Sequence, residues 1–412
     1  NEQEADIIVV NTCCFIHDAK QESVDNILEM AEYKKTGKLK ALIVTGCLAE
    51  RYRQEIIDEI PEVDAVLGTT AYDKILDAVD EALEGKHFLE MEDLQALPVV
   101  DTKRQITTGG HFAYMKIAEG CDKHCTYCII PKIRGTYRSV PMEQLIKEAE
   151  ELAAQGVKEL ILVAQETTLY GKDLYGEKSL HKLLKELCKV SGIQWIRILY
   201  CYPEEITDEL IQVIKEEPKI CHYLDLPIQH ANDEILKRMG RRTSKQELID
   251  IVTKLRKEIP DICLRTTLIT GFPGETEEQH QELVEFVDEM EFDRLGVFTY
   301  SPEEDTPAAT MADQIDEEVK LERQAELMEL QQEIAFDTAE KMIGREMLVM
   351  IEGKIADEPA YVGRTYRDAP KVDGLIFVET GELLMSGDFA KVTVTGAEEY
   401  DLIGGLTNEL TE

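Results

Sequence analysis

Short apolar runs alternate with stretches of helical spacing over the first 85 residues. The apolar runs lie at residues 6–10, 41–45 and 65–67, and the helical stretches that follow them lie at residues 18–33, 49–60 and 71–83. Uninterrupted apolar strands that alternate with helices are typical of a parallel sheet covered by helices on both faces. Residues 1–85 are therefore predicted to form a doubly wound α/β domain.

A second and longer series of the same kind follows a segment with little periodicity. This segment, residues 86–108, is interpreted as a linker that includes Pro98. Beyond it, six apolar strands are expected near residues 112–117, 160–164, 195–199, 222–226, 263–270 and 294–300. Six strand–helix units are fewer than the eight of a closed barrel, so residues 109–340 are predicted to form an open (β/α)6 partial barrel. A long helical pattern over residues 316–342 is expected to bridge to the next domain.

The pattern changes again in residues 341–412. Short alternating runs at residues 347–351, 375–378 and 390–394 are broken by glycine and proline, which predicts a small antiparallel β-barrel. Such barrels often bind RNA, but this segment carries 7 basic and 14 acidic residues. A surface of that sign repels phosphate. The whole chain is thus predicted to be an α/β multidomain protein.

Composition narrows the class of protein. Hydrophobic residues make up 43% and charged residues 31% of the 412 residues, as in ordinary globular proteins. The longest apolar runs are too short to span a bilayer, so no membrane partner is expected. Ten unevenly clustered cysteines indicate metal binding in a reducing cytoplasm rather than a disulfide framework. The net charge of −38 disfavours nucleic acid and favours a basic protein partner, although it also serves plain solubility.

Three cysteines with the spacing Cys-x3-Cys-x2-Cys follow the first strand of the central series. Thiolate sulfur from Cys121, Cys125 and Cys128 suits iron, and three such ligands hold three corners of a [4Fe–4S] cluster while the fourth iron stays open. A structural zinc ion is the alternative. Zinc sites usually combine two cysteine pairs, and no second pair follows here.

Further candidate residues lie at the carboxyl ends of predicted strands, where parallel sheets bind ligands. In the central series they are Gln165, Glu166, Thr167, Gln229, Ile269 and Gly271. Each of them could instead belong to a turn, and His230 could be a capping residue. In the first domain Cys13 and Cys47 follow two strands at equivalent ends and could converge on one metal, or each could be a buried thiol. The other cysteines, Cys14, Cys188, Cys201, Cys221 and Cys263, are expected in the core.

Taken together, these motifs resemble those of the radical S-adenosylmethionine (SAM) methylthiotransferase family. Tyr127 before the last cysteine of the loop gives the Cys-x3-Cys-x-aromatic-Cys signature of radical SAM enzymes. The other matching segments are residues 10–13, 44–50, 226–230 and 270–275, and residues 341–412 resemble the TRAM domain of that family. The resemblance covers essentially the whole chain.

This resemblance implies two [4Fe–4S] clusters and SAM in two roles, as a methyl donor and as a radical source. Cys121, Cys125 and Cys128 would hold the SAM-cleaving cluster, and Cys13 and Cys47 the second one. The resemblance also implies SAM contacts by Tyr127, Gln165, Glu166, Thr167, Gln229, Ile269 and Gly271. The third ligand of the second cluster, in a Gly-Cys-x-x-Asn segment, is absent here, and we attribute this to a missing start of the chain. Cys14 stands where the family commonly has glycine.

Residues 363–374 look like the version of the TRAM domain in the branch that modifies an aspartate of small-subunit ribosomal protein twelve. This branch implies a methylthio group added at the aspartate β-carbon, a basic protein substrate that is met possibly on the ribosomal subunit, and no direct tRNA binding. It also implies a low-potential electron donor and a monomer. The alternatives are a methylthiotransferase for tRNA adenosine and a non-catalytic iron–sulfur protein.

Overall fold

The computed structural model describes residues 1–97 and 104–408. It divides into two compact units. The first unit comprises Asn1–Lys103, Glu119–Arg138 and Ser301–Met311, and the second comprises Arg104–Ala118, Ser139–Tyr300 and Ala312–Glu412. Of the predicted linker, residues 98–103 lie outside the described residues, as do residues 409–412 of the predicted C-terminal domain.

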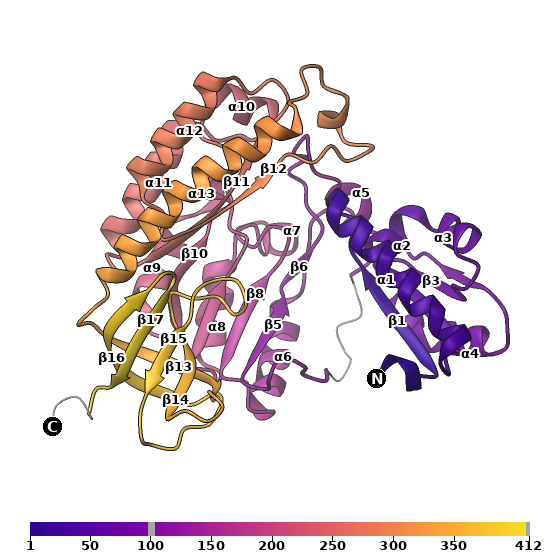
Figure 1. The fold of residues 1–412 in the computed structure, drawn as a ribbon, viewed down its shortest axis with the longest axis horizontal. Helices are drawn as coiled ribbons and strands as arrows, with labels where there is room; N and C mark the ends of the chain where they lie inside the picture. Colours follow the sequence, from indigo (N-terminus) through magenta and orange to yellow (C-terminus); the bar gives the residue numbers. More distant parts are fainter. Residues whose placement is uncertain (98–103, 409–412) are drawn as a thin grey trace. The chain divides into compact units, whose positions relative to one another are not determined.

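The first unit contains a four-stranded parallel sheet (Figure 1). Its strands in order are β1 (Ile7–Thr12), β2 (Ala41–Gly46), β3 (Ala65–Leu67) and β4 (Phe88–Glu90). Its helices are α1 (His17–Thr36), α2 (Cys47–Tyr52), α3 (Gln54–Glu59), α4 (Ile75–Leu83) and α5 (Ile130–Arg134), with single turns η1 (Glu2–Glu4), η2 (Tyr72–Lys74) and η4 (Pro307–Thr310). The predicted doubly wound class is confirmed. Every residue of β2 is buried, as its uninterrupted apolar run predicts.

Two local predictions in this unit were wrong. The strand β4 lies in the segment that was read as a linker, because three residues are too short to show a period. The helix predicted over residues 49–60 is broken at Arg53, which has a φ of 46° between α2 and α3. Apolar spacing continues across the break, so the sequence pattern does not reveal it.

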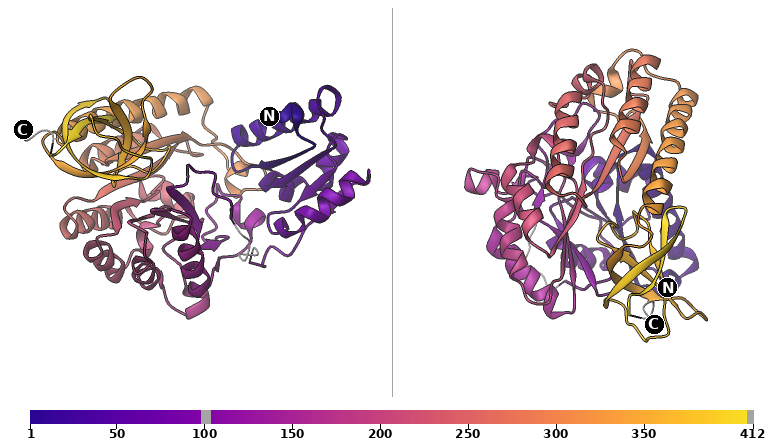
Figure 2. Two further views of the ribbon diagram at one scale, coloured as in Figure 1. Left: turned by 90° about the horizontal axis from the view of Figure 1, so that it is seen from below. Right: turned by 90° about the vertical axis from the view of Figure 1, so that its left-hand side faces the viewer.

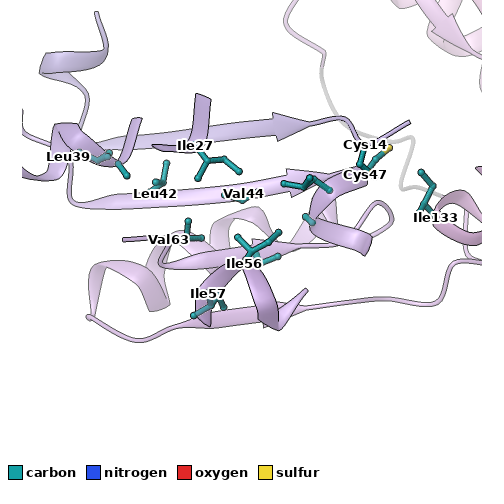
Figure 3. Packing of buried hydrophobic residues seen from close by; sticks show 14 of the residues in the cluster. Cys14, Ile27, Leu39, Leu42, Val44, Cys47, Ile56, Ile57, Val63 and Ile133 are labelled. Carbon is teal, nitrogen blue, oxygen red and sulfur yellow. The ribbon is translucent and has the colours of Figure 1, made fainter. Parts of the chain in front are cut away.

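The core of the first unit joins its sheet to the segment that follows the cysteine loop. Buried side chains of α1, β2, α2 and α3 form one apolar cluster, which Figure 3 shows from close by. Ile129 and Ile133 belong to this cluster although they lie beside the cysteine loop in the sequence. The loop that carries Cys121, Cys125 and Cys128 is therefore anchored to the amino-terminal sheet.

The second unit contains a six-stranded parallel sheet with helices on one face (Figure 1, Figure 2). The strand order is β12 (Arg294–Thr299), β11 (Cys263–Thr270), β10 (Ile220–Asp225), β9 (Trp195–Ile198), β8 (Glu159–Val163) and β5 (Phe112–Lys116). The edge strands are β12 and β5, and the sheet does not close on itself within the described residues. This confirms the open six-unit barrel.

The helices of this unit alternate with its strands along the chain. They are α6 (Met142–Ala154), α7 (Lys172–Tyr175), α8 (Leu180–Cys188), α9 (Asp208–Glu216), α10 (Asp233–Arg238), α11 (Lys245–Glu258), α12 (Glu277–Met290) and α13 (Glu317–Glu340), with one turn η3 (Pro203–Glu205). Ser244 and Thr276 each form a capping box with the residue three positions later, which fixes the starts of α11 and α12. In the described residues no helix is both long and apolar enough to cross a membrane.

A closed barrel completes the second unit. Its strands are β13 (Glu346–Lys354), β14 (Ala360–Thr365), β15 (Ile376–Glu379), β16 (Phe389–Glu398) and β17 (Asp401–Leu406), and a further two-stranded sheet joins β6 (Ala118–Glu119) to β7 (Arg138–Ser139). The predicted small barrel is confirmed, with β15 and β17 as a parallel pair. The strands β14 and β17 were not predicted, because both contain glycine and polar residues that weaken the alternation.

Candidate active site

The loop of three cysteines is held by backbone hydrogen bonds within the first unit. The amide of Cys121 donates to the carbonyl oxygen of Gly135 at 3.2 Å, and the amide of Cys128 donates to that of Cys125 at 3.0 Å. The amide of Tyr137 donates to the carboxylate of Asp122 at 3.1 Å. Cys121 and Cys125 are buried and Cys128 is half-buried. The fold thus presents three sulfur atoms on one short segment, and two of these cysteines are buried.

These thiols suit an iron–sulfur cluster. Burial is the main cause that raises the pKa of Cys128 to about 12, and the neighbouring thiols of Cys125 and Cys121 contribute to this rise. Such a thiol ionises near neutral pH only when a metal supplies positive charge. Within the described part of the chain, no group of three His, Cys, Asp or Glu side chains is arranged to hold a single metal ion. Each thiolate of a cubane cluster binds a different iron, so its ligands need not meet at one point.

The other candidate cysteines follow β1 and β2. Thr12 and Gly46 are paired in the parallel register, so Cys13 and Cys47 leave neighbouring strand ends, and Cys47 is the first residue of α2. Gly46 has a φ of 95°, and a Cβ there would lie 2.5 Å from the carbonyl oxygen of Thr12. Only glycine fits this close approach. Cys13 is exposed, whereas Cys47 is 7% exposed.

A third thiol lies beside these two. Cys14 is fully buried next to Cys47 in the apolar cluster (Figure 3). Burial raises its pKa to about 11, with a contribution from Cys47. Burial also raises the pKa of Cys47, and Arg134 opposes this rise. The expectation that Cys14 lies in the core agrees with its burial, as it does for Cys201, Cys221 and Cys263, whereas Cys188 is only half-buried.

Sequence reasoning missed one side chain at this site. The Nη2 atom of Arg134 lies 3.1 Å from the Sγ atom of Cys47, although 87 positions separate the two residues. In the sequence, Arg134 follows Cys128 by six positions. Its position after the three cysteines gives no sign that it reaches the amino-terminal thiols.

In the second unit, the residues after β8 bond mainly to their own neighbourhood. The hydroxyl of Thr167 donates to the carbonyl oxygen of Leu199 at 2.7 Å. The carboxylate of Glu166 accepts from the amide of Thr168 at 2.9 Å and from its hydroxyl. Glu166 and Thr167 are fully buried, while Gln165 is half-buried. Glu166 and Thr167 therefore shape the loop at the end of β8.

The structure brings Gln229 and Ile269 together. The amide of Ile269 donates to the carbonyl oxygen of Gln229 at 2.8 Å, and the amide of Gln229 donates to that of Thr267 at 2.9 Å. Gly271, with a φ of 68°, comes just after β11, and a Cβ there would overlap the side chain of Lys320. These three candidates lie at the carboxyl ends of β10 and β11.

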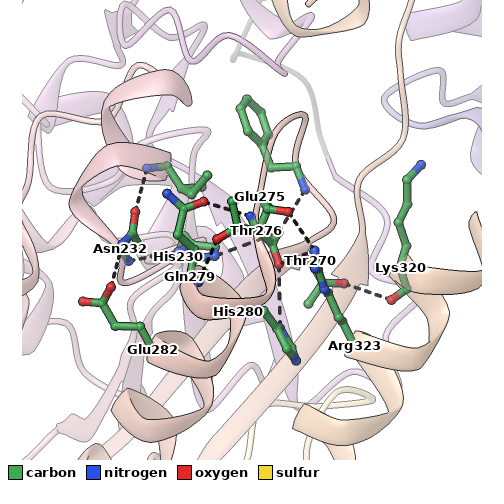
Figure 4. Close-up of polar contacts among 12 residues, drawn as sticks. His230, Asn232, Thr270, Glu275, Thr276, Gln279, His280, Glu282, Lys320 and Arg323 are labelled. Carbon is green, nitrogen blue, oxygen red and sulfur yellow. Dashed lines mark hydrogen bonds and ion pairs between the residues drawn. The ribbon is translucent and has the colours of Figure 1, made fainter. Parts of the chain in front are cut away.

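A buried polar network supports this turn (Figure 4). The Oε2 atom of Glu275 accepts from the amide of Phe272 at 3.1 Å, and its Oε1 atom lies 3.2 Å from Nη1 of Arg323. Nδ1 of His230 accepts from the amide of Asn232 at 3.0 Å, and burial lowers the pKa of His230 to about 3. His230 is thus a neutral histidine that caps the turn, which was the alternative reading of this residue.

Comparison with known proteins agrees with this architecture. Family models match residues 1–68 (uncharacterized protein family UPF0004), 115–287 (radical SAM superfamily) and 343–406 (TRAM domain). The radical SAM methyltransferase TsrM from Kitasatospora setae, solved with cobalamin and a [4Fe-4S] cluster, has a similar fold with a TM-score of 0.55 and 14% identity, over 74% of this chain and 66% of that one. The open six-stranded barrel, the cysteine loop and the family match define a radical SAM enzyme.

Two sequence relatives identify the branch. The ribosomal protein uS12 methylthiotransferase RimO of Lachnoclostridium phytofermentans is 67% identical over 404 residues, covering 98% of this chain and 92% of the relative. The protein of the same name from Clostridioides difficile is 51% identical over 408 residues, covering 99% and 92%. The chain belongs to the RimO family of radical SAM methylthiotransferases.

Proposed function

We propose that this chain transfers a methylthio group to the β-carbon of an aspartate in ribosomal protein uS12. The observation that carries this proposal is the 67% identity to a relative of that name, over nearly the whole chain. The cysteine loop, the open barrel and the small C-terminal barrel each have a part in such a reaction.

The three thiols of Cys121, Cys125 and Cys128 would hold a [4Fe–4S] cluster. With SAM bound, this cluster supplies the electron and the radical that remove hydrogen from an unactivated carbon. The protein fixes the cysteine loop through the backbone bonds at Cys121 and Cys128 and shields two of the thiols from water. Exclusion of water protects a reactive intermediate from side reactions.

Two further groups of residues complete the proposal. Cys13 and Cys47 would bind a second cluster, at which sulfur is methylated before transfer. The residues proposed to contribute to SAM binding are Tyr127, Gln165, Glu166, Thr167, Gln229, Ile269 and Gly271. For Glu166 and Thr167 this contribution is through the shape of the loop, because their side chains bond to neighbouring residues.

The charge of the small barrel supports a basic protein substrate. Two of its seven basic residues, Arg364 and Arg367, are buried in ion pairs with Glu159 and Asp293. Its exposed acidic residues are Glu346, Asp357, Glu358, Glu379, Glu382, Glu398 and Glu399. The exposed basic residues are Lys341, Arg345, Lys354, Lys371 and Lys391, so among the described residues the exposed charge of the barrel is still negative. Such a surface speeds encounter with a cationic partner and disfavours tRNA.

The cysteines and the proposed cluster both require reducing conditions. All ten cysteines lie in the described residues, and none of them forms a disulfide. In the reducing cytoplasm that we propose for this chain, a low-potential electron donor would have to reduce the cluster at Cys121, Cys125 and Cys128.

The test compares two substrates in one experiment. Anaerobically reconstituted protein is incubated with SAM, a sulfur source and dithionite, and with either uS12 or bulk tRNA. We expect a methylthio adduct on one aspartate of uS12 by mass spectrometry. Methylthiolated tRNA with unmodified uS12 would overturn the substrate assignment, and no 5′-deoxyadenosine with either substrate would overturn the enzyme class.

A further inference from the structure

The guanidinium of Arg134 lies against the sulfur of Cys47. The distance from Nη2 to Sγ is 3.1 Å, and Cys47 is 7% exposed. An N–H group at this distance from sulfur donates a hydrogen bond to it. Cys47 also belongs to the buried apolar cluster that contains the thiol of Cys14. A cationic donor is therefore directed at a buried sulfur.

Backbone contacts on both sides of Arg134 hold it in this position. Arg134 ends α5, and Gly135 follows it with a φ of 73°. Ile133 packs into the apolar cluster of the amino-terminal sheet, and its carbonyl oxygen accepts from the hydroxyl of Thr69 at 3.0 Å. Arg138 donates to the carbonyl oxygen of Arg134 at 3.1 Å. These contacts fix the backbone at Arg134 independently of its side chain.

The same guanidinium also contacts the start of the cysteine loop. Its Nη1 atom lies 3.6 Å from Oε2 of Glu119, which is 2% exposed and precedes Gly120 and Cys121 in the chain. The hydroxyl of Tyr72 also bonds to it. A planar guanidinium has separate N–H groups for a sulfur, a carboxylate and a hydroxyl, which a lysine ammonium cannot serve in one plane. Pairing with Glu119 alone explains why the charge is buried, but not why one N–H group is directed at sulfur.

We propose that Arg134 is a positioning residue that raises the reduction potential of the iron–sulfur cluster bound through Cys47 and connects that cysteine to the loop that begins at Cys121. This inference rests on the proposed function, which places a cluster at Cys13 and Cys47. A hydrogen bond to a ligating sulfur withdraws electron density from it and stabilises the reduced cluster. The cationic guanidinium acts in the same direction, because reduction adds one negative charge to the cluster.

The test measures a potential. The chain is produced from its full reading frame with Cys121→Ala, Cys125→Ala and Cys128→Ala, so that only the amino-terminal cluster remains, and it is titrated with dithionite while electron paramagnetic resonance reports the reduced cluster. Three variants are compared in this background, R134Q, R134K and R51Q. Arg51 is the control, since its side chain is also 7% exposed and contacts the carbonyl oxygen and the thiol of Cys14 and the carboxylate of Glu303, rather than the thiol of Cys47.

We expect R134Q to lower the ratio of reduced to oxidised cluster at least tenfold at a fixed potential, a shift of about 59 mV for one electron. R134K should restore part of the parent protein's reduction potential. R51Q should shift the potential by less than R134K does. An unchanged potential in R134Q, with iron content and signal shape retained, would overturn the inference. An equal shift in R51Q would also overturn it, because the effect would then be one of general charge.

The proposed function fails in a distinguishable way. If the parent protein of this series binds no iron and gives no signal, Cys13 and Cys47 hold no cluster, and that part of the proposed function is wrong. If R134Q alone loses its iron, R134K is analysed in its place, and both its iron content and its reduction potential are measured. Retained iron in R134K with an unshifted potential would contradict the tuning role, whereas an intermediate potential would support it.

Discussion

The guanidinium of Arg364 lies 2.6 Å from the carboxylate of Glu159, and both side chains are almost fully buried. Glu159 begins β8 of the six-stranded sheet, whereas Arg364 lies on β14 of the small barrel. The same carboxylate accepts from Nε of Arg197 at 2.8 Å. Burial opposes ionisation of Glu159, but Arg197 and Arg364 outweigh it, so that its pKa is lowered.

Arg364 belongs to residues 363–374, the segment that resembles the TRAM domain of the uS12-modifying branch. Its ion pair with Glu159 indicates a structural role for this segment. From Arg364 to Asp373 its charged residues other than Lys371 form ion pairs, among them Asp368 with Arg294 at 2.7 Å and Asp373 with Arg265 at 3.6 Å on the six-stranded sheet. The segment therefore attaches the small barrel to the sheet.

Arg364→Met is expected to lower the free energy of unfolding by about 3–5 kcal/mol, because Glu159 stays buried with one partner fewer. Trp195 is the only tryptophan of the chain and is 4% exposed in β9, so its fluorescence reports the unfolding of this unit in urea. The control is Lys371→Met in the same segment, since Lys371 is exposed. Equal losses in the two variants would show that the buried pair contributes nothing particular.

Local features were predictable from the sequence, and long-range ones were not. The cysteine loop spans eight positions, and each of the two capping boxes spans four, so their patterns are complete within a short stretch. Arg364 and Glu159 are 205 positions apart, and Arg134 and Cys47 are 87 apart. A charged residue in a sequence gives no sign of a partner at that distance, and buried arginines are rare enough that exposure is the default expectation.

The two groups of cysteines are expected to fail differently. Cys128→Ala should abolish 5′-deoxyadenosine formation, because the cluster that cleaves SAM loses a ligand. Cys47→Ala should keep 5′-deoxyadenosine formation within a few-fold and lose only the methylthiolated product. Both products are measured in one assay by liquid chromatography and mass spectrometry. A Cys47→Ala protein that still methylthiolates uS12 would remove Cys47 from the proposed second cluster.

The acidic barrel is expected to govern the rate of encounter with uS12. The double variant Glu398→Lys and Glu399→Lys reverses two exposed charges between β16 and β17. It should slow association several-fold at low salt, with little change in dissociation. Stopped-flow measurements at two salt concentrations test this, and the difference should shrink at the higher one.

The matched control for this experiment lies on another element. Glu22→Lys and Glu29→Lys change the net charge equally on the exposed face of α1. If this control slows association as much as the barrel variant, the effect comes from the net charge of −38 and not from the barrel.

The buried His230 is expected to make the second unit less stable below neutral pH. Its pKa is about 3 in the folded protein because of burial, against about 6.5 for an exposed histidine. Between these values the unfolded chain takes up a proton that the folded chain does not. The free energy of unfolding should therefore fall by up to about 1.4 kcal/mol for each pH unit below 6.5.

The variant His230→Asn isolates this contribution. The asparagine Oδ1 atom can accept from the amide of Asn232 in place of Nδ1 of His230, so the turn keeps its hydrogen bond while the titrating group is lost. Glu275, whose Oε2 atom lies 4.0 Å from Nε2 of His230, has a pKa raised by burial. A carboxyl group of that kind gains a proton on folding and stabilises the folded chain as the pH falls, which is the opposite sign. Urea unfolding at pH 7.5, 6.5 and 5.5, followed by Trp195 fluorescence, should give a smaller pH dependence in His230→Asn than in the parent protein. An equal dependence in both would mean that other groups carry it and that His230 is protonated in the folded chain.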